Sequence, residues 1–527
     1  MTGPVAAPAI ASRRLLLGSV AAGLFLAALD TYVVVTVLPR MMFDLTIPID
    51  RIEQATPVIT GFLLGYIVTM PLLGAVSDRY GRGRVYLISL GIFCLGSVLT
   101  ATAGLAAIPD ENAGGLPWLV AGRVLQGLGG GALVPVALAL AADLYPVGRR
   151  SLPLGVVAAL QETGSVLGPL YGAVVAGAAV GLGGWRAIFW INLPLAAICA
   201  VGFLVAARTG VGHAGPGRTA VAGHASASVD WLGGILLGLG LGLLVLALYP
   251  DDPSRHAVGS LFLPLGVAAV VVLGLYGWRQ ATGSSPLIPP ALLRDRAFVG
   301  ANLTNLLVGA GLMVALVDVP IVARGVFGLG EFDAALLLAR FMVAIPVGAV
   351  VGGWLSGRLG YRLTAVLGLL VAASAFLRMS TWTVDELSRT VAGIPDSLVT
   401  LFLCGFGFGL VIAPVAAAIL DRSQDREHGL ASSLVVVART VGMLLGLSAL
   451  AAFGIHRFYQ LIQADSGARL DVTQGVGAVA ALQARFVAAL LQEYHEIFSI
   501  AAGVCLLAAV IALLTLQGGR PSARTAA

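Results

Sequence analysis

The feature that most constrains this chain is a succession of long stretches that carry almost no charge. A helix that crosses the hydrocarbon core of a bilayer needs about 20 apolar residues, and such stretches follow one another along most of the sequence. Only 11% of the residues are charged, against about 25% in soluble domains. The sequence therefore predicts an all-α polytopic membrane protein with fourteen spans, grouped as six, two and six. They lie near residues 15–39, 57–77, 84–107, 116–141, 151–179, 185–207, 231–249, 258–278, 297–323, 331–356, 361–380, 397–420, 427–458 and 487–516.

The arginines predict the orientation. Every cationic side chain of Lys or Arg type is an arginine, so a lysine Schiff base or lysine general base is excluded. Most of these arginines, beginning with Arg13 and Arg14, fall in loops on one side of the predicted spans. Because positive loops stay in the cytoplasm, we expect both termini to be cytoplasmic. The first apolar stretch is too long for the apolar region of a signal peptide. We therefore expect a multi-pass protein of the inner (plasma) membrane.

The loops between the stretches predict the organisation of the chain. The segment 208–230 is rich in Gly, Ala and Ser, which is typical of a flexible linker, and 280–296 forms a second cytoplasmic connection. The predicted order is a six-helix bundle (1–207), the linker (208–230), two inserted spans (231–279), the second connection (280–296) and a second six-helix bundle (297–527) with a periplasmic hairpin at about 459–486.

An internal repeat relates the two predicted bundles. The loop after the second span reads GAVSDRYGRGR (74–84), and the loop after the second span of the last six reads GGWLSGRLGYR (352–362). Gly74, Asp78, Arg79 and Gly81 align with Gly353, Gly357, Arg358 and Gly360. Parallel repeats of this kind are typical of secondary transporters. Because a glycine stands opposite Asp78, only the first copy keeps the full set of charges.

Five charged residues lie inside predicted spans: Asp30, Arg123, Glu162, Arg340 and Arg439. An ionised side chain at the centre of a bilayer costs at least about 2.5 kcal/mol, so these groups should face one another or water. A helix rises about 1.5 Å per residue, which places Asp30 and Arg123 at similar depth. It also places Glu162 level with Arg439 or Arg340, and depth alone does not choose between the two arginines.

These charges have two interpretations. They are static ion pairs that hold helices together, or they are groups that bind and release protons. A buried carboxylate whose arginine partner moves away in another conformation would take up a proton. We favour proton coupling for Asp30 and Glu162, and we weigh a structural and a functional role equally for Arg123 and Arg340. Arg439 is expected as a countercharge.

The fifth span carries a stripe of small residues. Gly164, Gly168 and Gly172 recur every four residues and therefore lie on one face, where another helix can approach closely. Pro169 lacks a backbone donor and should bend the span. Tight packing without any function is the alternative interpretation.

Several motifs now identify a resemblance to the major facilitator superfamily, in particular to its fourteen-helix drug:proton antiporters. The loop at 74–84 resembles motif A, RVLQGLGGG (123–131) resembles motif B, and GSVLGPLYG (164–172) resembles the antiporter motif C. LDTYVVVTVLP (29–39) and GWRAIFWINLP (184–194) resemble two further motifs of the antiporters. The resemblance implies a major facilitator fold in which Asp78, Arg79 and Arg84 latch the cytoplasmic side. Glu162 departs from the pattern, because that position is usually uncharged in these antiporters.

The last two spans are unusually long. The sequence continues as helix beyond the bilayer on either side of residues 465–475, with an apolar stripe formed by Val476, Val479, Leu482, Phe486, Leu490 and Tyr494. We predict an outer helical hairpin, the alternative being a loop with short turns. Such a hairpin is similar to that of the mycobacterial triacylglyceride and multidrug exporters of this family. That resemblance implies a periplasmic lipid-carrying lipoprotein as partner.

We therefore predict a proton-coupled exporter of lipophilic molecules such as triacylglycerides, which works by alternating access. Efflux of amphipathic drugs without a dedicated lipid cargo is the alternative. An enzyme is not expected, because the six histidines do not pair at metal-ligand spacing and no P-loop is present. The four cysteines are scattered in apolar runs and suggest no metal site. We expect no cofactor beyond the proton gradient, no nucleic-acid partner, and a monomer.

Overall fold

The computed structural model describes most of the chain as long helices. The described residues are 7–45, 47, 55–104, 115–146, 149–178, 184–208, 230–248, 261–283, 288–391, 393–424, 427–464 and 476–516. The predicted linker at 208–230 and the predicted turn between the last two spans lie almost entirely outside them.

The first six long helices form what we call the N-terminal half. They are α1 (Ala7–Asp44), α2 (Thr56–Tyr80), α3 (Arg82–Thr102), α4 (Leu116–Leu144), α5 (Ser151–Ala178) and α6 (Arg186–Ala206). Two helices, α8 (Trp231–Leu248) and α9 (Phe262–Thr282), follow as the insert. We call the end of the molecule at which α1, α3 and α5 begin the inner end, in line with the orientation predicted from the arginines.

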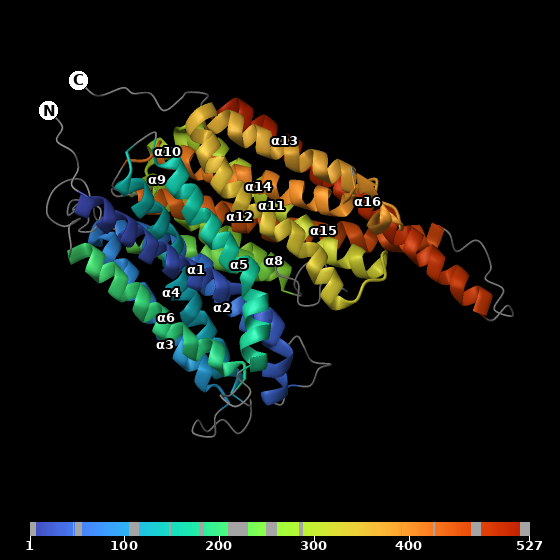
Figure 1. The fold of residues 1–527 in the computed structure, drawn as a ribbon. Helices are drawn as coiled ribbons and strands as arrows, with labels where there is room; N and C mark the ends of the chain where they lie inside the picture. The colour runs from blue at the N-terminus through green and yellow to red at the C-terminus, as the bar shows by residue number, and fades with distance from the viewer. Residues whose placement is uncertain are drawn as a thin grey trace.

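The remaining helices form the C-terminal half. The short α10 (Pro290–Arg294) leads into α11 (Arg296–Gly325), α12 (Glu331–Leu359) and α13 (Tyr361–Met379). A 3-10 turn (Glu386–Ser388) and a two-stranded antiparallel sheet, β1 (Thr390–Val391) with β2 (Ile394–Pro395), precede α14 (Asp396–Leu420), α15 (His428–Ala464) and α16 (Val476–Thr515). Figure 1 shows the blue-to-green helices α1–α4 and α6 gathered on one side and the yellow-to-red helices on the other.

Thirteen of these helices are long and apolar enough to cross a membrane, by length and composition, among the residues that the structure describes. The long helix that falls outside this set is α5, although it has 28 residues. Gln161 and Glu162 at its centre lower its average hydropathy. The structure therefore has a helix for each predicted span, while the crossing of α5 stays a prediction.

The two halves are built on the same packing of their first and fifth helices. In the N-terminal half, a Cβ added to Gly164 of α5 would lie 2.6 Å from the Phe25 carbonyl oxygen of α1. In the C-terminal half, a Cβ on Gly446 of α15 would lie 2.8 Å from the Ala310 carbonyl oxygen of α11, and one on Gly442 would clash with the Leu306 backbone. The glycine stripe predicted for α5 thus has a counterpart on α15.

Because α11 and α15 are in close contact, one methyl group added between them should lower the stability of the protein. We expect Gly442→Ala to destabilise the protein by about 1–3 kcal/mol, because the added carbon overpacks a backbone-to-backbone contact. The control is Gly503→Ala on α16, where nothing lies within 4 Å of the added Cβ, and where alanine favours the helix by up to about 1 kcal/mol. Thermal unfolding in lipid nanodiscs compares the two variants. Equal melting temperatures would contradict the packing described here.

The insert packs against the N-terminal half. A Cβ on Gly238 of α8 would lie 2.5 Å from the Val68 carbonyl oxygen of α2. Arg279 at the end of α9 pairs with Asp230 just before α8, with Nη2 2.8 Å from Oδ1. Burial opposes ionisation of Asp230, but hydrogen bonds from Arg279 and the Gly233 amide outweigh it and hold the pKa of that carboxyl below its usual value. This pair ties the inner ends of α8 and α9 together.

The ends of α15 and α16 extend beyond the other helices at the outer end of the molecule (Figure 1). Phe458 and Phe486 stack edge to face across the two helices, with ring centroids 5.2 Å apart. The predicted apolar stripe is partly wrong: Phe486 is 46% exposed, but Leu490 and Tyr494 are buried in the C-terminal half. They are buried because α11 packs against this part of α16.

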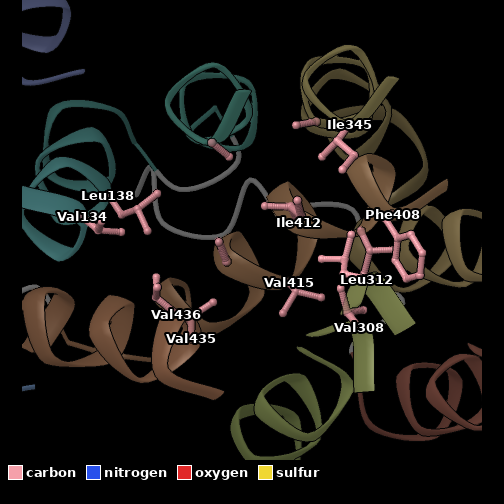
Figure 2. Packing of buried hydrophobic residues seen from close by; sticks show 14 of the residues in the cluster. Val134, Leu138, Val308, Leu312, Ile345, Phe408, Ile412, Val415, Val435 and Val436 are labelled. Carbon is pink, nitrogen blue, oxygen red and sulfur yellow. The ribbon is translucent and has the colours of Figure 1, made fainter. Parts of the chain in front are cut away.

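A continuous apolar core joins the two halves near the inner end. In Figure 2, Val134 and Leu138 of α4 lie opposite Val435 and Val436 of α15. Ser432 of α15 donates a hydrogen bond to a backbone oxygen of α4, Pro135 O, at 3.0 Å. This contact brings together residues that lie nearly 300 positions apart in the sequence, and it positions the polar groups described next.

Candidate functional site

The most deeply buried charges form a pair inside the N-terminal half. Asp30 of α1 and Arg123 of α4 are both fully buried, and the Arg123 Nη1 lies 2.5 Å from the Asp30 Oδ2. Arg123 also donates from Nη2 to the backbone oxygen of Asp30, at 3.3 Å. The structure therefore brings together the two residues that depth matching predicts. Since each would be costly alone at this depth, the pair explains why both are tolerated.

Neutral polar side chains complete the surroundings of Asp30. Asn192 of α6 donates to the Asp30 Oδ1 at 2.9 Å, and Gln126 of α4 donates to the same atom at 3.2 Å. Ser97 of α3 accepts from both amides. These three residues were missed in the sequence, although each lies in an otherwise apolar stretch at the depth of Asp30. A buried carboxylate with this many donors is held in one geometry.

Aromatic rings close the site around the arginine. The guanidinium carbon of Arg123 lies 4.3 Å from the centre of the Phe62 ring and 6.0 Å from that of Phe189. A cation over a desolvated aromatic face gains about 2 kcal/mol. We call Asp30, Arg123, Gln126 and Asn192 with Ser97 the Asp30 cluster. It draws on α1, α3, α4 and α6, so it lies wholly within the N-terminal half.

A second ion pair connects the two halves. Glu162 of α5 and Arg439 of α15 pair at 2.9 Å between Oε1 and Nη1. Their side chains keep 15% and 11% of their surface exposed, unlike the sealed Asp30 cluster. The other arginine considered for Glu162, Arg340, instead donates to Ser397 at 3.0 Å within the C-terminal half. The pair therefore makes a contact that must break whenever α5 and α15 separate.

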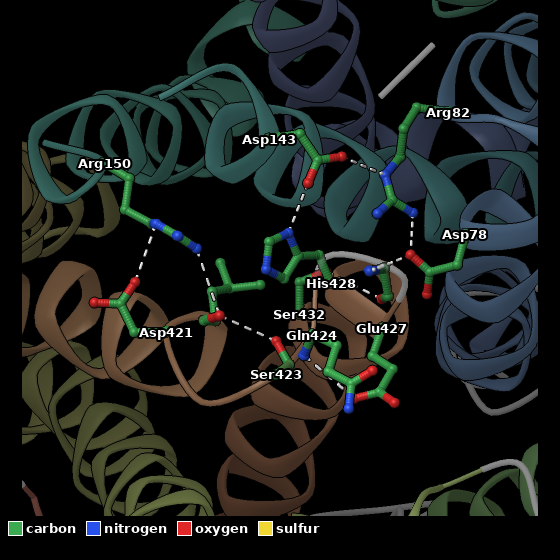
Figure 3. A network of polar contacts seen from close by, with 12 residues as sticks. Asp78, Arg82, Asp143, Arg150, Asp421, Ser423, Gln424, Glu427, His428 and Ser432 are labelled. Atoms are coloured by element: carbon green, nitrogen blue, oxygen red, sulfur yellow. Dashed lines mark hydrogen bonds and ion pairs between the residues drawn. The ribbon is translucent and has the colours of Figure 1, made fainter. Parts of the chain in front are cut away.

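The inner end carries a larger polar network, which we call the inner gate (Figure 3). Its charged and titratable members are Asp78, Arg82, Asp143, Arg150, Asp421 and His428. Asp78 of α2 accepts hydrogen bonds from the backbone amides of Gly429 and Leu430, at 2.8 and 3.0 Å. Those amides lie in the first turn of α15, where the helix dipole favours a negative charge. Asp78 of the N-terminal half therefore lies opposite the N-terminus of a helix of the C-terminal half.

Arg82 of α3 links Asp78 to a second carboxylate. It pairs with Asp78, and its Nε lies 3.2 Å from the Asp143 Oδ2 on α4. Asp143 in turn meets the Nδ1 of His428 at 2.6 Å, where α15 begins. Figure 3 shows the resulting line from Asp78 to His428, which crosses from the N-terminal half to the C-terminal half. Neither Asp143 nor His428 was singled out in the sequence.

The predicted latch of Asp78, Arg79 and Arg84 stays a prediction, and the structure adds Arg82 to it. Arg84 has an exposed side chain, and Arg79 packs over the Tyr80 ring with its guanidinium carbon 5.4 Å from the centroid. Arg82, which was not singled out in the sequence, is the arginine that pairs with Asp78. The reason is that α3 begins at Arg82, directly after the turn at Gly81, where φ is 99°. The rotation of α3 about its axis decides which arginine points at α2 and α4.

Close backbone approach completes the inner gate. A Cβ on Gly74 of α2 would clash with the Gly429 carbonyl of α15, and one on Gly353 of α12 would lie 2.7 Å from the Ser151 carbonyl of α5. The aligned glycines of the two repeat loops thus serve the same purpose in both halves. Arg150, which directly precedes α5, adds an ion pair to Asp421 at 3.0 Å. The inner gate is closed in this structure.

Removal of one charge should loosen this gate. We expect Asp78→Asn to cost about 1–2 kcal/mol of gate stability, because it removes a carboxylate from a helix N-terminus and from Arg82. The measurement is the spin–spin distance between labels on Arg84→Cys and Arg358→Cys, two exposed positions in opposite halves. Their separation should increase in the variant.

The matched control for the gate is Asp295→Asn. Asp295 also caps a helix at the inner end, accepting from the Ala297 amide at 2.8 Å, but its contacts stay within the C-terminal half. This variant should leave the label separation unchanged. If both variants widened the distance equally, the inner gate would not depend on Asp78.

Comparisons with known proteins agree on the nature of this chain. The family model described as Major Facilitator Superfamily matches residues 20–447. A triacylglyceride transporter of Mycolicibacterium hassiacum is 41% identical, over 99% of this chain and 95% of that protein. One of Mycobacterium tuberculosis is 40% identical, over 96% of this chain and 95% of that protein.

Solved structures share the fold at low sequence identity. The human organic anion transporter MFSD10 superposes with a TM-score of 0.60 at 15% identity, covering 95% of this chain and 99% of that one. The proton:xylose symporter XylE superposes with a TM-score of 0.58 at 16% identity, covering 95% of each chain. The predicted all-α transporter fold is thereby confirmed.

Proposed function

This chain belongs to the major facilitator superfamily, and from that premise we propose that it exports lipophilic molecules, triacylglycerides first among them, in exchange for protons. It is a multi-pass membrane transporter and not an enzyme. The proposal includes alternating access of a monomer in the inner membrane, with both termini in the cytoplasm.

The cargo is proposed from the relatives. Two proteins named triacylglyceride transporters match this chain at about 40% identity over nearly its whole length. Identity of this extent, without large gaps in coverage, supports a shared class of cargo. The apolar residues where the halves meet, such as Val435 and Val436, are compatible with lipid and offer few partners to a polar solute.

The observation that carries proton exchange is the ion pair between Glu162 and Arg439. Because one partner belongs to each half, motion of the halves relative to one another separates the charges. A carboxylate left near the membrane centre without its arginine is costly, and a proton removes that cost. Glu162 would thus carry a proton in the state where the pair is broken and lose it when Arg439 returns.

The Asp30 cluster would act differently. All of its members lie in the N-terminal half, so a rigid movement of the halves leaves the pair with Arg123 intact. We propose that Asp30 responds to protons only when α1 shifts against α4 and α6, for example as the halves bend. The glycine stripe of α5, whose Gly164 and Gly172 pack against α1, would permit such a shift.

The direct test uses purified full-length protein in liposomes that contain labelled triacylglyceride. An imposed pH gradient should drive movement of the label, and a proton carrier that collapses the gradient should stop it. Transport of drugs but not of lipid under the same gradient would favour the alternative, efflux of amphipathic drugs. Absence of gradient-driven movement with every lipophilic cargo would overturn the proposal.

The outer ends of α15 and α16 test the lipid assignment. We propose that they form a docking surface for a periplasmic lipid-carrying lipoprotein. Deletion of residues 462–484 should abolish lipid delivery and spare drug efflux, since the membrane part of the transporter remains. The matched variant keeps both helices at full length but replaces the exposed Ile462 and Phe486 with serine. Survival of lipid delivery in the deletion would contradict this role.

A further inference from the structure

Two acidic side chains of the C-terminal half take no part in the function proposed above. Asp318 lies on α11, seven residues before that helix ends at Gly325, which is about 10 Å of helix. Glu493 lies on α16 at a similar height, because a Cβ on Gly325 would lie 3.0 Å from Leu490, one turn before Glu493. Both therefore belong to the outer end of the C-terminal half.

The two carboxyl groups lie inside the packing of three helices. Asp318 is 4% exposed and Glu493 is 6% exposed. A Cβ on Gly454 of α15 would lie 2.5 Å from the Glu493 Oε1, so α15 closes the site from its own side. Asp318 lies seven residues, about two turns, before Gly325 and therefore on the same face of α11. That face meets α16 at Leu490, next to Glu493.

These acids differ from the other buried carboxylates in their partners. Within the part of the chain that the structure describes, neither Asp318 nor Glu493 forms an ion pair, and the Oδ2 of Asp318 has no hydrogen-bond partner. Asp30 and Glu162, by contrast, each contact an arginine at 2.5 and 2.9 Å. A buried carboxylate without a countercharge calls for another explanation.

The charged groups nearby do not supply the missing cation. Arg457 of α15 is held by Glu496, with its Nε and Nη2 each 2.7 Å from a carboxylate oxygen. Glu496 itself adds negative charge beside Glu493. His495 is turned away and meets the Trp382 carbonyl oxygen at 2.6 Å. Because Arg457 and Glu496 neutralise each other, this pair leaves the two acids without a countercharge.

Two ionised carboxylates at this depth cannot both persist. Each is costly when it is ionised and buried without a partner, and their mutual repulsion adds to that cost. A single proton removes one charge and turns one carboxyl group into a hydrogen-bond donor. We propose that Asp318 and Glu493 together hold one proton, which makes this junction of α11, α15 and α16 a proton-binding site distinct from Asp30 and Glu162.

The position of the site gives the proton a structural role. It lies where α15 and α16 leave the packed C-terminal half, so the proton permits α11 and α16 to pack closely around two acids. Movement of α16 away from α11 would expose the carboxyl groups to water and release the proton. The outer ends of α15 and α16 would thereby be linked to the pH of the outer compartment.

Infrared spectroscopy tests the proton directly. The full-length protein in lipid nanodiscs at neutral pH should show the C=O stretching band of a protonated carboxylic acid. The double variant Asp318→Asn/Glu493→Gln should remove that band, whereas each single variant should keep it at a shifted frequency, because the remaining buried carboxyl group still lacks a countercharge. Asp30→Asn is the matched control and should leave the band intact, since Asp30 is ion-paired. A band that the double variant leaves unchanged would overturn the proposal.

Thermal stability gives an independent readout. Each single neutral variant should melt at the same temperature as the wild type or a few degrees higher, because an amide in place of one carboxyl group leaves the site with no more charge than the shared proton does. The double variant should melt no more than a few degrees from the better single variant. A fall of many degrees in either single variant would mean that the acids are ionised and paired with a cation, which contradicts a shared proton. Neither measurement depends on transport.

Discussion

Arg123→Ala is expected to destabilise the protein by about 3–5 kcal/mol and to abolish transport. Its guanidinium neutralises Asp30, and both side chains are fully buried. Removal of one partner of a buried ion pair leaves an uncompensated charge, which is costlier than the net value of the pair. The variant also loses the contact of the arginine with the Phe62 ring. Chemical or thermal unfolding in nanodiscs measures the stability.

A second variant separates charge from packing at this site. Asp30→Asn combined with Arg123→Gln removes both charges, so most of the lost stability should return. The amides of Gln126 and Asn192 can still donate to the side-chain oxygen that the substitution at position 30 retains. A loss below about 1 kcal/mol in Arg123→Ala would show that Asp30 is not held as an ion by Arg123.

The control for Arg123 lies on the same half of the molecule. Arg186 pairs with Asp44 at 2.7 Å, but the Asp44 side chain is 37% exposed. Pairs that reach solvent contribute about 0–1 kcal/mol. Arg186→Ala should therefore cost far less stability than Arg123→Ala. Equal losses would imply that burial does not set the cost, against the argument made here.

Glu162→Gln should give a different pattern, with its largest effect on coupling and a smaller loss of stability than Arg123→Ala. The pair with Arg439 is mostly buried but keeps some contact with water, and glutamine can still accept a hydrogen bond from Arg439, so the loss should stay below the value of about 3–5 kcal/mol expected for a sealed pair. Glutamine imitates the protonated side chain in every conformation and cannot release a proton. Gradient-driven export should fall by about tenfold or more, which corresponds to about 1.4 kcal/mol, while exchange of cargo without a gradient should persist.

The matched control for Glu162 is Arg340→Gln. Arg340 also lies within a predicted span, but it bonds to Ser397 and not to Glu162. It should therefore leave the dependence of export on the gradient largely intact. Wild-type response to the gradient in Glu162→Gln would remove this residue from the coupling mechanism and leave Asp30 as the candidate.

Much of the architecture could be predicted because a membrane helix is recognisable from the apolar residues of its own local sequence. Runs of apolar residues give the positions of the long helices, and the loops at 74–84 and 352–362 give the repeat. Both loops turn at a glycine with positive φ, Gly81 at 99° and Gly360 at 83°. Local sequence determines such turns, since few residues other than glycine adopt that backbone conformation.

The sequence predicted the depth of each charged side chain in the membrane, but it did not predict every partner. Counting residues along a helix gives the height of a side chain, and this was enough to match Asp30 with Arg123. It could not choose Arg439 over Arg340 for Glu162, and it did not reveal Arg82 as the partner of Asp78. Those choices depend on which helix faces which, and on the rotation of each helix about its own axis.

By itself, therefore, the sequence determined that this protein is a helical membrane transporter with costly charges at defined depths. Tertiary structure alone decided that Glu162 and Arg439 join the two halves while Asp30 and Arg123 stay within one. It also decided that Asp318 and Glu493, which lie 175 positions apart in the sequence, share one buried site. The physical reason is that hydropathy and helical rise are local properties, whereas the partner of a buried charge is set by the packing of distant helices.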